Sequence, residues 1–221
     1  MGKDTILTPV QRRFLDIILK EPYLLRKYYW TGGTALSEIY LKHRDSQDID
    51  LFTEKDEIHL PSIKKFVGIA STLLKSKSIL HKKFFGLHTF VFKFPNDELK
   101  VDFNYYPFLR INKGGKWKGL EIDSLEDIAA NKIHTISVNP RGRDYIDIFY
   151  ILKKGKYSLD WLVKLAKAKF DWDIDPIQLG INFIRVVEFK DYPKMFVPFN
   201  PREMEKFFLD LAKSLEKDIF K

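Results

Sequence analysis

The hydrophobic pattern of this chain changes near residue 120, and the change limits the folds open to it. Between residues 78 and 105 apolar and polar residues alternate as in consecutive antiparallel strands, with a turn at Pro95-Asn96-Asp97. Beyond residue 120 the apolar residues recur at helical spacing. We therefore expect an α+β fold in two parts: a mixed sheet with flanking helices over residues 1–120, and a helical part over residues 121–221.

Prolines and capping residues indicate where the individual helices begin and end. Helix starts are expected at Pro9, Thr34 and Pro61 in the first part, and near Ser124, Asp144, Ser158, Pro176 and Pro201 in the second. The first helix should end near Glu21-Pro22. Short strands are expected at residues 28–30 and 49–52, and a further turn at Asn112–Lys116.

The composition excludes several classes of protein. The chain has no cysteine, so disulfides and thiolate metal sites are excluded. Its first twenty residues do not resemble a secretory signal, and no apolar run approaches the roughly eighteen residues that a membrane span needs. We expect a soluble protein of the cytoplasm that makes no contact with a membrane.

Positive charge is concentrated in the middle of the chain. The formal net charge is +8, yet residues 61–120 alone carry twelve lysines and arginines against three acids, interleaved with Phe, Tyr and Trp. Such a segment fits a phosphate-rich partner such as nucleic acid. It also fits a lysine-rich surface that only keeps the protein in solution, and charge alone does not decide between the two.

Acidic residues occur at strand spacing in two places. In Asp48-Ile49-Asp50 a period of two puts both carboxylates on one face of the strand, and in residues 99–103 it turns Asp102 away from its apolar neighbours. If the two strands are neighbours, three carboxylates converge. Two Mg²⁺ ions about 3.5–4 Å apart would relieve their repulsion and clamp a phosphoryl displacement. A single Asp-x-Asp, however, is more often a solvated strand or turn.

A glycine pair precedes the first acidic strand, and a short predicted helix separates the two. Gly32 and Gly33 let backbone N–H groups approach a phosphate, the helix start favours negative charge, and Thr34 adds a hydroxyl. A lone Gly-Gly-Thr is often only a turn and helix cap. Its position fourteen residues before Asp48 would bring a phosphate cradle beside a metal site.

The stretch Trp30–Leu36 together with His43–Phe52 resembles the AbiEii/AbiGii-toxin type of nucleotidyltransferase, in the DNA polymerase β-like superfamily. The likeness continues in Asp127–Lys132 and in Arg143–Ile148, where a helical lysine and an Arg-Asp-x-x-Asp helix face the nucleotide in that family. The resemblance spans roughly residues 28–152 and implies a nucleotidyltransferase-type mixed sheet.

The resemblance also implies roles for individual residues. Asp48 and Asp50 would hold Mg²⁺ and the triphosphate, while the other nucleotide-binding positions would be Gly32, Gly33, Thr34, Arg44 and Ser46. Lys132 would touch the phosphates or base of the nucleotide, and Asp144 would be a further polar residue of the catalytic site. Asp102 is our own candidate for the third carboxylate, as a metal ligand or as base for the attacking hydroxyl.

Three of these positions have structural alternatives. Lys132 could be a solvated helix lysine, and Arg143 with Asp144 could form a purely structural ion pair. For His43 a satisfied polar residue at a helix end is favoured over a ligand.

Proteins of this family act as toxins of bacterial toxin–antitoxin or abortive-infection pairs, and some add nucleotides to the 3′ end of tRNA. The resemblance thus implies a Mg²⁺-dependent transferase that uses a nucleoside triphosphate, with RNA, here tRNA, as acceptor and a cognate antitoxin as partner. Two alternatives stay open: a non-catalytic nucleotide- or RNA-binding protein, and a transferase that acts on a small molecule.

Overall fold

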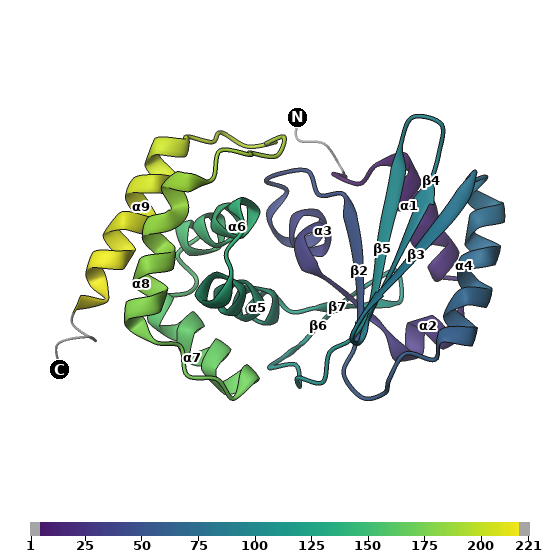
Figure 1. Ribbon diagram of the computed structural model, residues 1–221, viewed down its shortest axis with the longest axis horizontal. Helices are drawn as coiled ribbons and strands as arrows, with labels where there is room; N and C mark the ends of the chain where they lie inside the picture. The colour runs from purple at the N-terminus through teal and green to yellow at the C-terminus, as the bar shows by residue number, and fades with distance from the viewer. Residues whose placement is uncertain (1–4, 217–221) are drawn as a thin grey trace. The chain divides into compact units, whose positions relative to one another are not determined.

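The chain folds into two compact units, Met1–Ser124 and Leu125–Lys221, of which the computed structural model describes residues 5–216 (Figure 1). The division lies beyond residue 120 because residues 120–123 form a strand of the sheet. Within the described residues, no helix is both long and apolar enough to span a bilayer.

The first unit contains one mixed sheet of seven strands. In sequence order these are β1 (Tyr29–Thr31), β2 (Asp48–Thr53), β3 (Ser78–Phe84), β4 (Leu87–Lys93), β5 (Glu98–Tyr105), β6 (Lys113–Trp117) and β7 (Leu120–Asp123). In space they follow the order β3-β4-β5-β2-β1-β7-β6. The pairs β2·β5 and β1·β7 are parallel and the other pairs are antiparallel. The two strands predicted to carry the acids are therefore direct neighbours.

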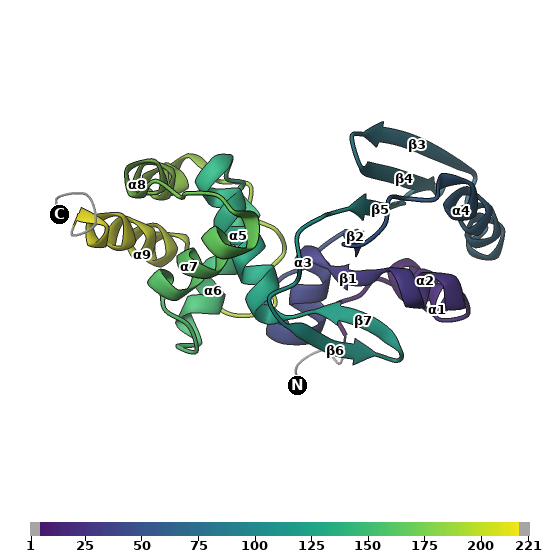
Figure 2. The same ribbon diagram turned by 90° about the horizontal axis from the view of Figure 1, so that it is seen from below.

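Two helices cover one face of this sheet, and a third lies on the other side of β1 and β2 (Figure 2). The first two are α1 (Pro9–Ile18) and α4 (Leu60–Leu74); the third is α3 (Gly32–Ala35), which continues as a π-helix, η1 (Leu36–Leu41). Phe14 of α1 and Phe66 of α4 pack edge-on against each other, with ring centroids 5.8 Å apart, and Phe66 also meets Phe103 of β5. These aromatic contacts form the core of the covered face.

The second unit consists of helices: α5 (Leu125–Val138), α6 (Gly142–Lys153), α7 (Leu159–Phe170), α8 (Pro176–Ile184), the 3-10 turn η2 (Arg185–Glu188) and α9 (Pro201–Ser214). Ser158 caps α7 and Asn200 caps α9 with their side-chain oxygens, as their positions predict. Asn182 of α8 donates hydrogen bonds to the carbonyls of Ile136 and Ser137, which stabilises the end of α5.

The α+β fold predicted from the sequence is confirmed, while four local predictions were wrong. Residues 22–27 form an additional helix, α2 (Pro22–Lys27), and α3 begins at Gly32, two residues earlier than expected. Residues 112–116, expected as a turn, mostly belong to β6, because the reversal occurs at Lys118-Gly119 where both φ angles are positive. Helix α6 begins at Gly142 instead of Asp144.

Candidate active site

Three carboxylates share one face of the sheet where β2 and β5 run side by side. The parallel register pairs Asp48 with Lys100 and Asp50 with Asp102, so all four side chains point to the same face. The intervening Ile49, Val101 and Phe103 are fully buried on the opposite face. The convergence expected if these strands were neighbours is present.

Lys100 lies between two of these acids. Its Nζ is 2.9 Å from Asp102 Oδ2 and 3.2 Å from Asp48 Oδ2. Burial opposes the charged ammonium, but its hydrogen bonds and its attraction to Asp102 and Asp48 outweigh burial and raise the pKa of Lys100. Lys100 therefore stays charged and offsets part of the repulsion between the acids.

Asp102 faces the expected side of the sheet but is not open to solvent there. Its side chain is only 8 % exposed, and Thr89 Oγ1 of β4 donates a hydrogen bond of 2.6 Å to its Oδ1. With Lys100 on the other oxygen, both carboxylate oxygens already have donors. The sequence predicted that Asp102 faces outward, and the solvent exposure that this implied was wrong. The cause is Thr89 of the neighbouring strand, a partner that the local sequence pattern does not reveal.

The glycine pair lies directly against the acids. Gly32 has φ +76°, and a Cβ at this position would lie 2.0 Å from Asp50 Oδ2. A Cβ at Gly33 would lie 2.7 Å from Arg44 Nη2 and 3.0 Å from Ser46 Oγ. Only residues without a side chain allow this approach. The predicted positions Gly32, Gly33, Arg44, Ser46 and Asp50 therefore form one cluster.

Thr34 holds this cluster together from the helix side. Its hydroxyl is fully buried and donates a hydrogen bond to the main-chain carbonyl of Asp48. Because a hydroxyl has a single proton, Thr34 in this structure fastens α3 to β2 instead of presenting a donor to a ligand. The residues that follow form the π-helix η1, a geometry that occurs often at functional sites.

The loop between η1 and β2 is fixed by residues that sequence reasoning missed. Gln11 of α1, 1 % exposed, donates through Nε2 to the carbonyls of Ser46 and Gln47 at 2.8 and 3.0 Å. Its Oε1 completes the capping box at the start of α1. His43 is also buried, with Nδ1 3.2 Å from Ser37 Oγ, which agrees with a satisfied polar role.

The donor set of this cluster fits Mg²⁺ in its chemistry. Asp48 and Asp50 offer hard carboxylate oxygens on one strand face, the type of ligand that Mg²⁺ prefers together with water and phosphate oxygens. Asp102 would join them only if Lys100 moved. Among residues 5–216, no group of three or more His, Cys, Asp or Glu is arranged as a metal site.

We expect Gly32→Ala to lower nucleotide transfer at least tenfold. A left-handed φ costs alanine about 1–2 kcal/mol, and the added methyl must displace the Asp50 carboxylate. Steady-state turnover and Tm would be measured side by side. Gly68→Ala is the matched control: Gly68 lies in α4, where an added methyl would have nothing within 4 Å of it, so turnover should be unchanged and stability should rise slightly. Equal turnover in the two variants would contradict the role of Gly32.

The second unit contains its own buried charge cluster. Lys132 Nζ of α5 lies 2.6 Å from Asp144 Oδ1 and 2.8 Å from Asp147 Oδ2 of α6, and both acids are fully buried. Arg141 Nε is 2.7 Å from the other oxygen of Asp144. Burial alone would raise the pKa of Asp144, but the charges and hydrogen bonds of Lys132 and Arg141 lower it below its usual range.

These contacts rule out one of the structural alternatives, a solvated Lys132. Lys132 is 7 % exposed, so a solvated helix lysine was the wrong description. Its carboxylate partner Asp147 had no role in the sequence analysis, although it is the last acid of the Arg-Asp-x-x-Asp pattern. Asp127, from the other matching motif, accepts a hydrogen bond of 2.7 Å from Lys169 with both side chains fully buried, which ties α5 to α7.

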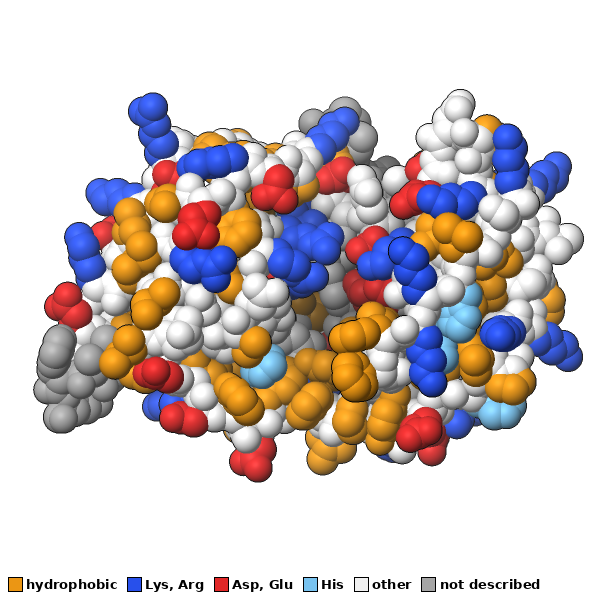
Figure 3. Space-filling view, in the orientation of Figure 1, with side chains coloured by type: hydrophobic (Ala, Val, Ile, Leu, Met, Phe, Trp, Pro, Cys, Tyr) orange, Lys and Arg blue, Asp and Glu red, His pale blue; other side chains and the backbone are white. Residues whose placement is uncertain are grey.

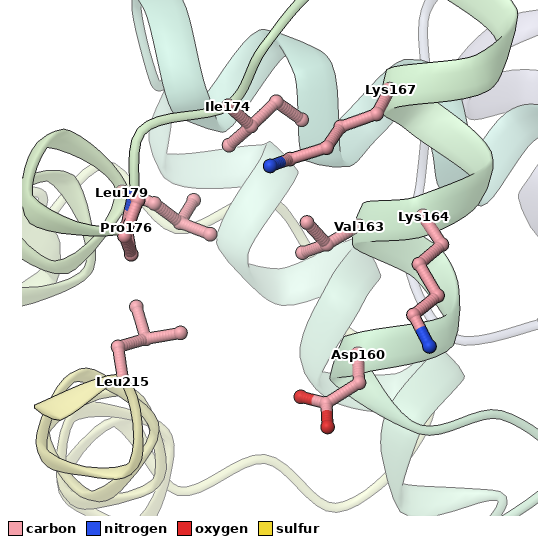
Figure 4. A pocket seen from close by; sticks show the side chains of 8 residues that line it. All are labelled: Asp160, Val163, Lys164, Lys167, Ile174, Pro176, Leu179 and Leu215. Carbon is pink, nitrogen blue, oxygen red and sulfur yellow. The ribbon is translucent and has the colours of Figure 1, made fainter. Parts of the chain in front are cut away.

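The second unit also has an apolar pocket of about 420 Å³ between α7, α8 and the end of α9 (Figure 4). Charged residues of α7 lie at its rim, and its apolar lining consists of Val163, Ile174, Pro176, Leu179 and Leu215. None of the predicted site residues lines it. We assign it no part in the chemistry.

Known proteins resemble this chain over most of its length. A family model described as "Nucleotidyl transferase AbiEii toxin, Type IV TA system" matches residues 13–217. The uncharacterised protein aq_aa25 of Aquifex aeolicus (strain VF5) is 30 % identical over 189 residues, which are 82 % of this chain and 84 % of that protein.

Two solved structures from Helicobacter pylori have the same fold. JHP933 superposes with a TM-score of 0.59 at 19 % identity, over 95 % of this chain and 90 % of its own. A second H. pylori chain, a proposed nucleotidyltransferase, gives a TM-score of 0.57 at 18 % identity, over 95 % and 92 % of the two chains.

Proposed function

Because this chain belongs to the AbiEii family of nucleotidyl transferase toxins of type IV toxin–antitoxin systems, it is a nucleotidyltransferase, and we propose that it acts with Mg²⁺ on RNA. In the proposed reaction a hydroxyl oxygen of the RNA attacks the α-phosphorus of a nucleoside triphosphate. The bond from the α-phosphorus to the bridging oxygen breaks, pyrophosphate leaves, and the hydroxyl loses its proton. The family implies an antitoxin partner; the 3′ end of tRNA as the acceptor is part of our proposal.

The observation that carries this proposal is the placing of Asp48 and Asp50 on one strand face against Gly32. When bound, Mg²⁺ would supply positive charge for the triphosphate and for the developing charge on pyrophosphate. Asp48 and Asp50 would hold it, and Gly32 and Gly33 would let the phosphates approach the backbone. Arg44 and Ser46, which adjoin Gly33, would brace the loop beside them.

Asp102 is the candidate base for the RNA hydroxyl. It lies in register with Asp50, on the neighbouring strand. Thr89 Oγ1 donates to one of its carboxylate oxygens and Lys100 Nζ to the other, so the orientation of the carboxylate is fixed. Lys100 would then serve as the group that keeps this base oriented.

Lys132 and Asp144 are proposed to act on the nucleotide from the second unit. Lys132 has three N–H donors, and the contacts to Asp144 and Asp147 account for two of them. A third donor directed at a phosphate would stabilise charge on the leaving pyrophosphate. Asp144 would act by holding Lys132 in place.

RNA is preferred over a small-molecule acceptor because of the charge on the first unit. The basic segment 61–120 would repel a cationic small molecule and attract a phosphate backbone. On the face drawn in Figure 3, lysine and arginine side chains are spread widely, with hydrophobic side chains between them. A purely binding protein is disfavoured because it has no need of two adjacent carboxylates that repel the phosphates it binds.

The test is incubation of the protein with each labelled nucleoside triphosphate, Mg²⁺ and total RNA, followed by a denaturing gel. We expect label in an RNA band of tRNA size with at least one triphosphate, and none when EDTA replaces Mg²⁺. RNA binding should also weaken steeply as salt rises, because each neutralised phosphate releases counterions. Binding without labelling under every condition would instead support the non-catalytic alternative.

A further inference from the structure

The face that carries the acids continues across the sheet to its edge. Cross-strand register places Asp102 of β5 beside Thr89 of β4, and Thr89 beside Lys82 of β3. Paired residues point to the same face, so Asp50, Asp102, Thr89 and Lys82 form one row. With strands about 4.8 Å apart, Lys82 stands roughly 14 Å from Asp50, measured along the row.

The outer part of this face is open. On β3 the side chains of this face are all exposed: Ser78, Leu80, Lys82 and Phe84. Phe84 is 70 % exposed and Leu80 48 %, and at the tip of the hairpin Phe85 is 83 % exposed and packs edge-on against Phe84. Large apolar side chains rarely remain this exposed in a group without a partner.

On the opposite face of the same hairpin His88 and Phe90 of β4 are buried, while His81 and Lys83 of β3 are exposed. There His81 stacks on His88 and on Phe90, the latter at a centroid distance of 4.4 Å. Burial, together with the positive charges of Lys64 and Lys83, lowers the pKa of His81. Consecutive residues of β3 thus point to opposite faces of the sheet: Lys82 to the face of Thr89 and Asp102, and Lys83 to the face of His88.

Four of the twelve basic residues in segment 61–120 form ion pairs with acids in the described part of the chain. Those with carboxylate partners are Lys93, Lys100, Arg110 and Lys118. Within the described part of the chain, Lys82 has no such partner. Lys82 is therefore a cation available to a phosphate on the same sheet face as the carboxylates.

We propose that the open face of the β3–β4 hairpin, defined by Leu80, Lys82 and Phe84, is the track that binds the single-stranded part of the RNA acceptor and leads it to Asp102. The proposal rests on the proposed function and adds the route by which the RNA strand reaches the active site. Phe84 would stack on a base and Lys82 would bind a phosphate, the combination that proteins use for single strands. Leu80 extends the apolar surface between them.

The test compares two charge reversals with the same net charge, Lys82→Glu and Lys83→Glu. The probe is a short, fluorescein-labelled single-stranded RNA of mixed sequence, and its Kd is measured by anisotropy without triphosphate. We expect Lys82→Glu to raise the Kd roughly tenfold and Lys83→Glu to raise it much less, because Lys83 faces the other way. Both residues are exposed, so both variants should keep the wild-type Tm.

Phe84→Ala supplies an independent arm of the test. Loss of one base–aromatic stack should raise the Kd for RNA about tenfold or more, while Phe84→Tyr should restore it. The KM for the triphosphate should not change in either variant. A lysine on an edge strand can also serve only to prevent edge-to-edge association. In that case Lys82→Glu and Lys83→Glu would bind RNA equally well, and the track would be refuted.

This outcome is distinguishable from failure of the proposed function. Asp50→Ala should bind the RNA probe with wild-type Kd while losing transfer, so binding and chemistry are read separately. If the wild-type protein labels no RNA at all, the acceptor class is wrong. If it labels RNA and the two lysine reversals bind alike, the acceptor is right and the path is wrong.

Discussion

Asp50→Ala is expected to abolish nucleotide transfer while the protein remains folded, and Asp48→Ala should do the same. Both side chains lie on the face of β2 opposite to the apolar core and are only half-buried, so neither contributes to the core. Loss of a ligand to the metal should cost several kcal/mol of transition-state stabilisation, roughly a thousandfold or more in rate. Single-turnover transfer and Tm are the two measurements.

The control for this pair is Asp97→Ala. Asp97 is an exposed acid of the same unit, in the turn between β4 and β5, and its carboxylate only accepts a hydrogen bond from the next residue. We expect its transfer rate to stay within about twofold of wild type, as for surface substitutions in general. Near wild-type transfer by Asp48→Ala or Asp50→Ala would refute the metal assignment.

Lys132→Ala is expected to destabilise the protein by about 3–5 kcal/mol, because it leaves Asp144 and Asp147 buried without their shared cation. The Tm should fall by an amount on the order of 10 °C. Calorimetry at neutral pH is the measurement. The matched control is Lys167→Ala, which removes a lysine of the same unit from an exposed pair with Asp173 and should cost about 1 kcal/mol at most.

Acid should reduce this difference between Lys132→Ala and wild type. The pKa of Asp144 is lowered in the folded state, so its contribution to stability is complete above its unfolded pKa and is lost as pH falls toward the folded value. The Lys132→Ala variant lacks the part of this contribution that comes from Lys132 at every pH. The two proteins should therefore approach each other in stability below about pH 4, the unfolded pKa of an aspartate.

Catalytic and structural roles of Lys132 are separated by measuring turnover well below the Tm of the variant. If Lys132 also contacts the nucleotide, turnover per folded molecule should fall about 10²–10³-fold, the scale of one preorganised donor. If turnover recovers fully once the variant is folded, Lys132 belongs only to the buried cluster. The proposed contribution of the second unit to catalysis would then be wrong.

The sequence was sufficient for the parts of the site that depend on local spacing. The period of two fixed the shared face of Asp48 and Asp50, and the glycine pair indicated a close backbone approach before any partner was known. The family resemblance, also drawn from these residues, is confirmed by the match over residues 13–217. The α+β fold followed from the change of pattern near residue 120.

The remainder depended on contacts between distant segments. Gln11 reaches a loop 35 residues further along the chain, and Lys100 reaches an acid 52 residues away. Such partners cannot be read from spacing, because either residue type is ordinary at its own position. The prediction of a turn at Asn112–Lys116 was wrong for a similar reason, because pairing with β7 keeps the glycine-rich segment extended.

The position of β1 has a consequence for how the sheet is completed during synthesis. β1 is only three residues long and lies between β2 and β7, with Tyr29 paired to Glu121 across a separation of 92 residues. Until residues 120–123 leave the ribosome, the main-chain groups on one side of β1 have no strand partner. Long-range pairing of this kind is slow and leaves an edge open to association with other chains. Fragments that stop before β7 should therefore be aggregation-prone, because the last strand of the first unit, which ends at Asp123, is the one that closes this side of β1.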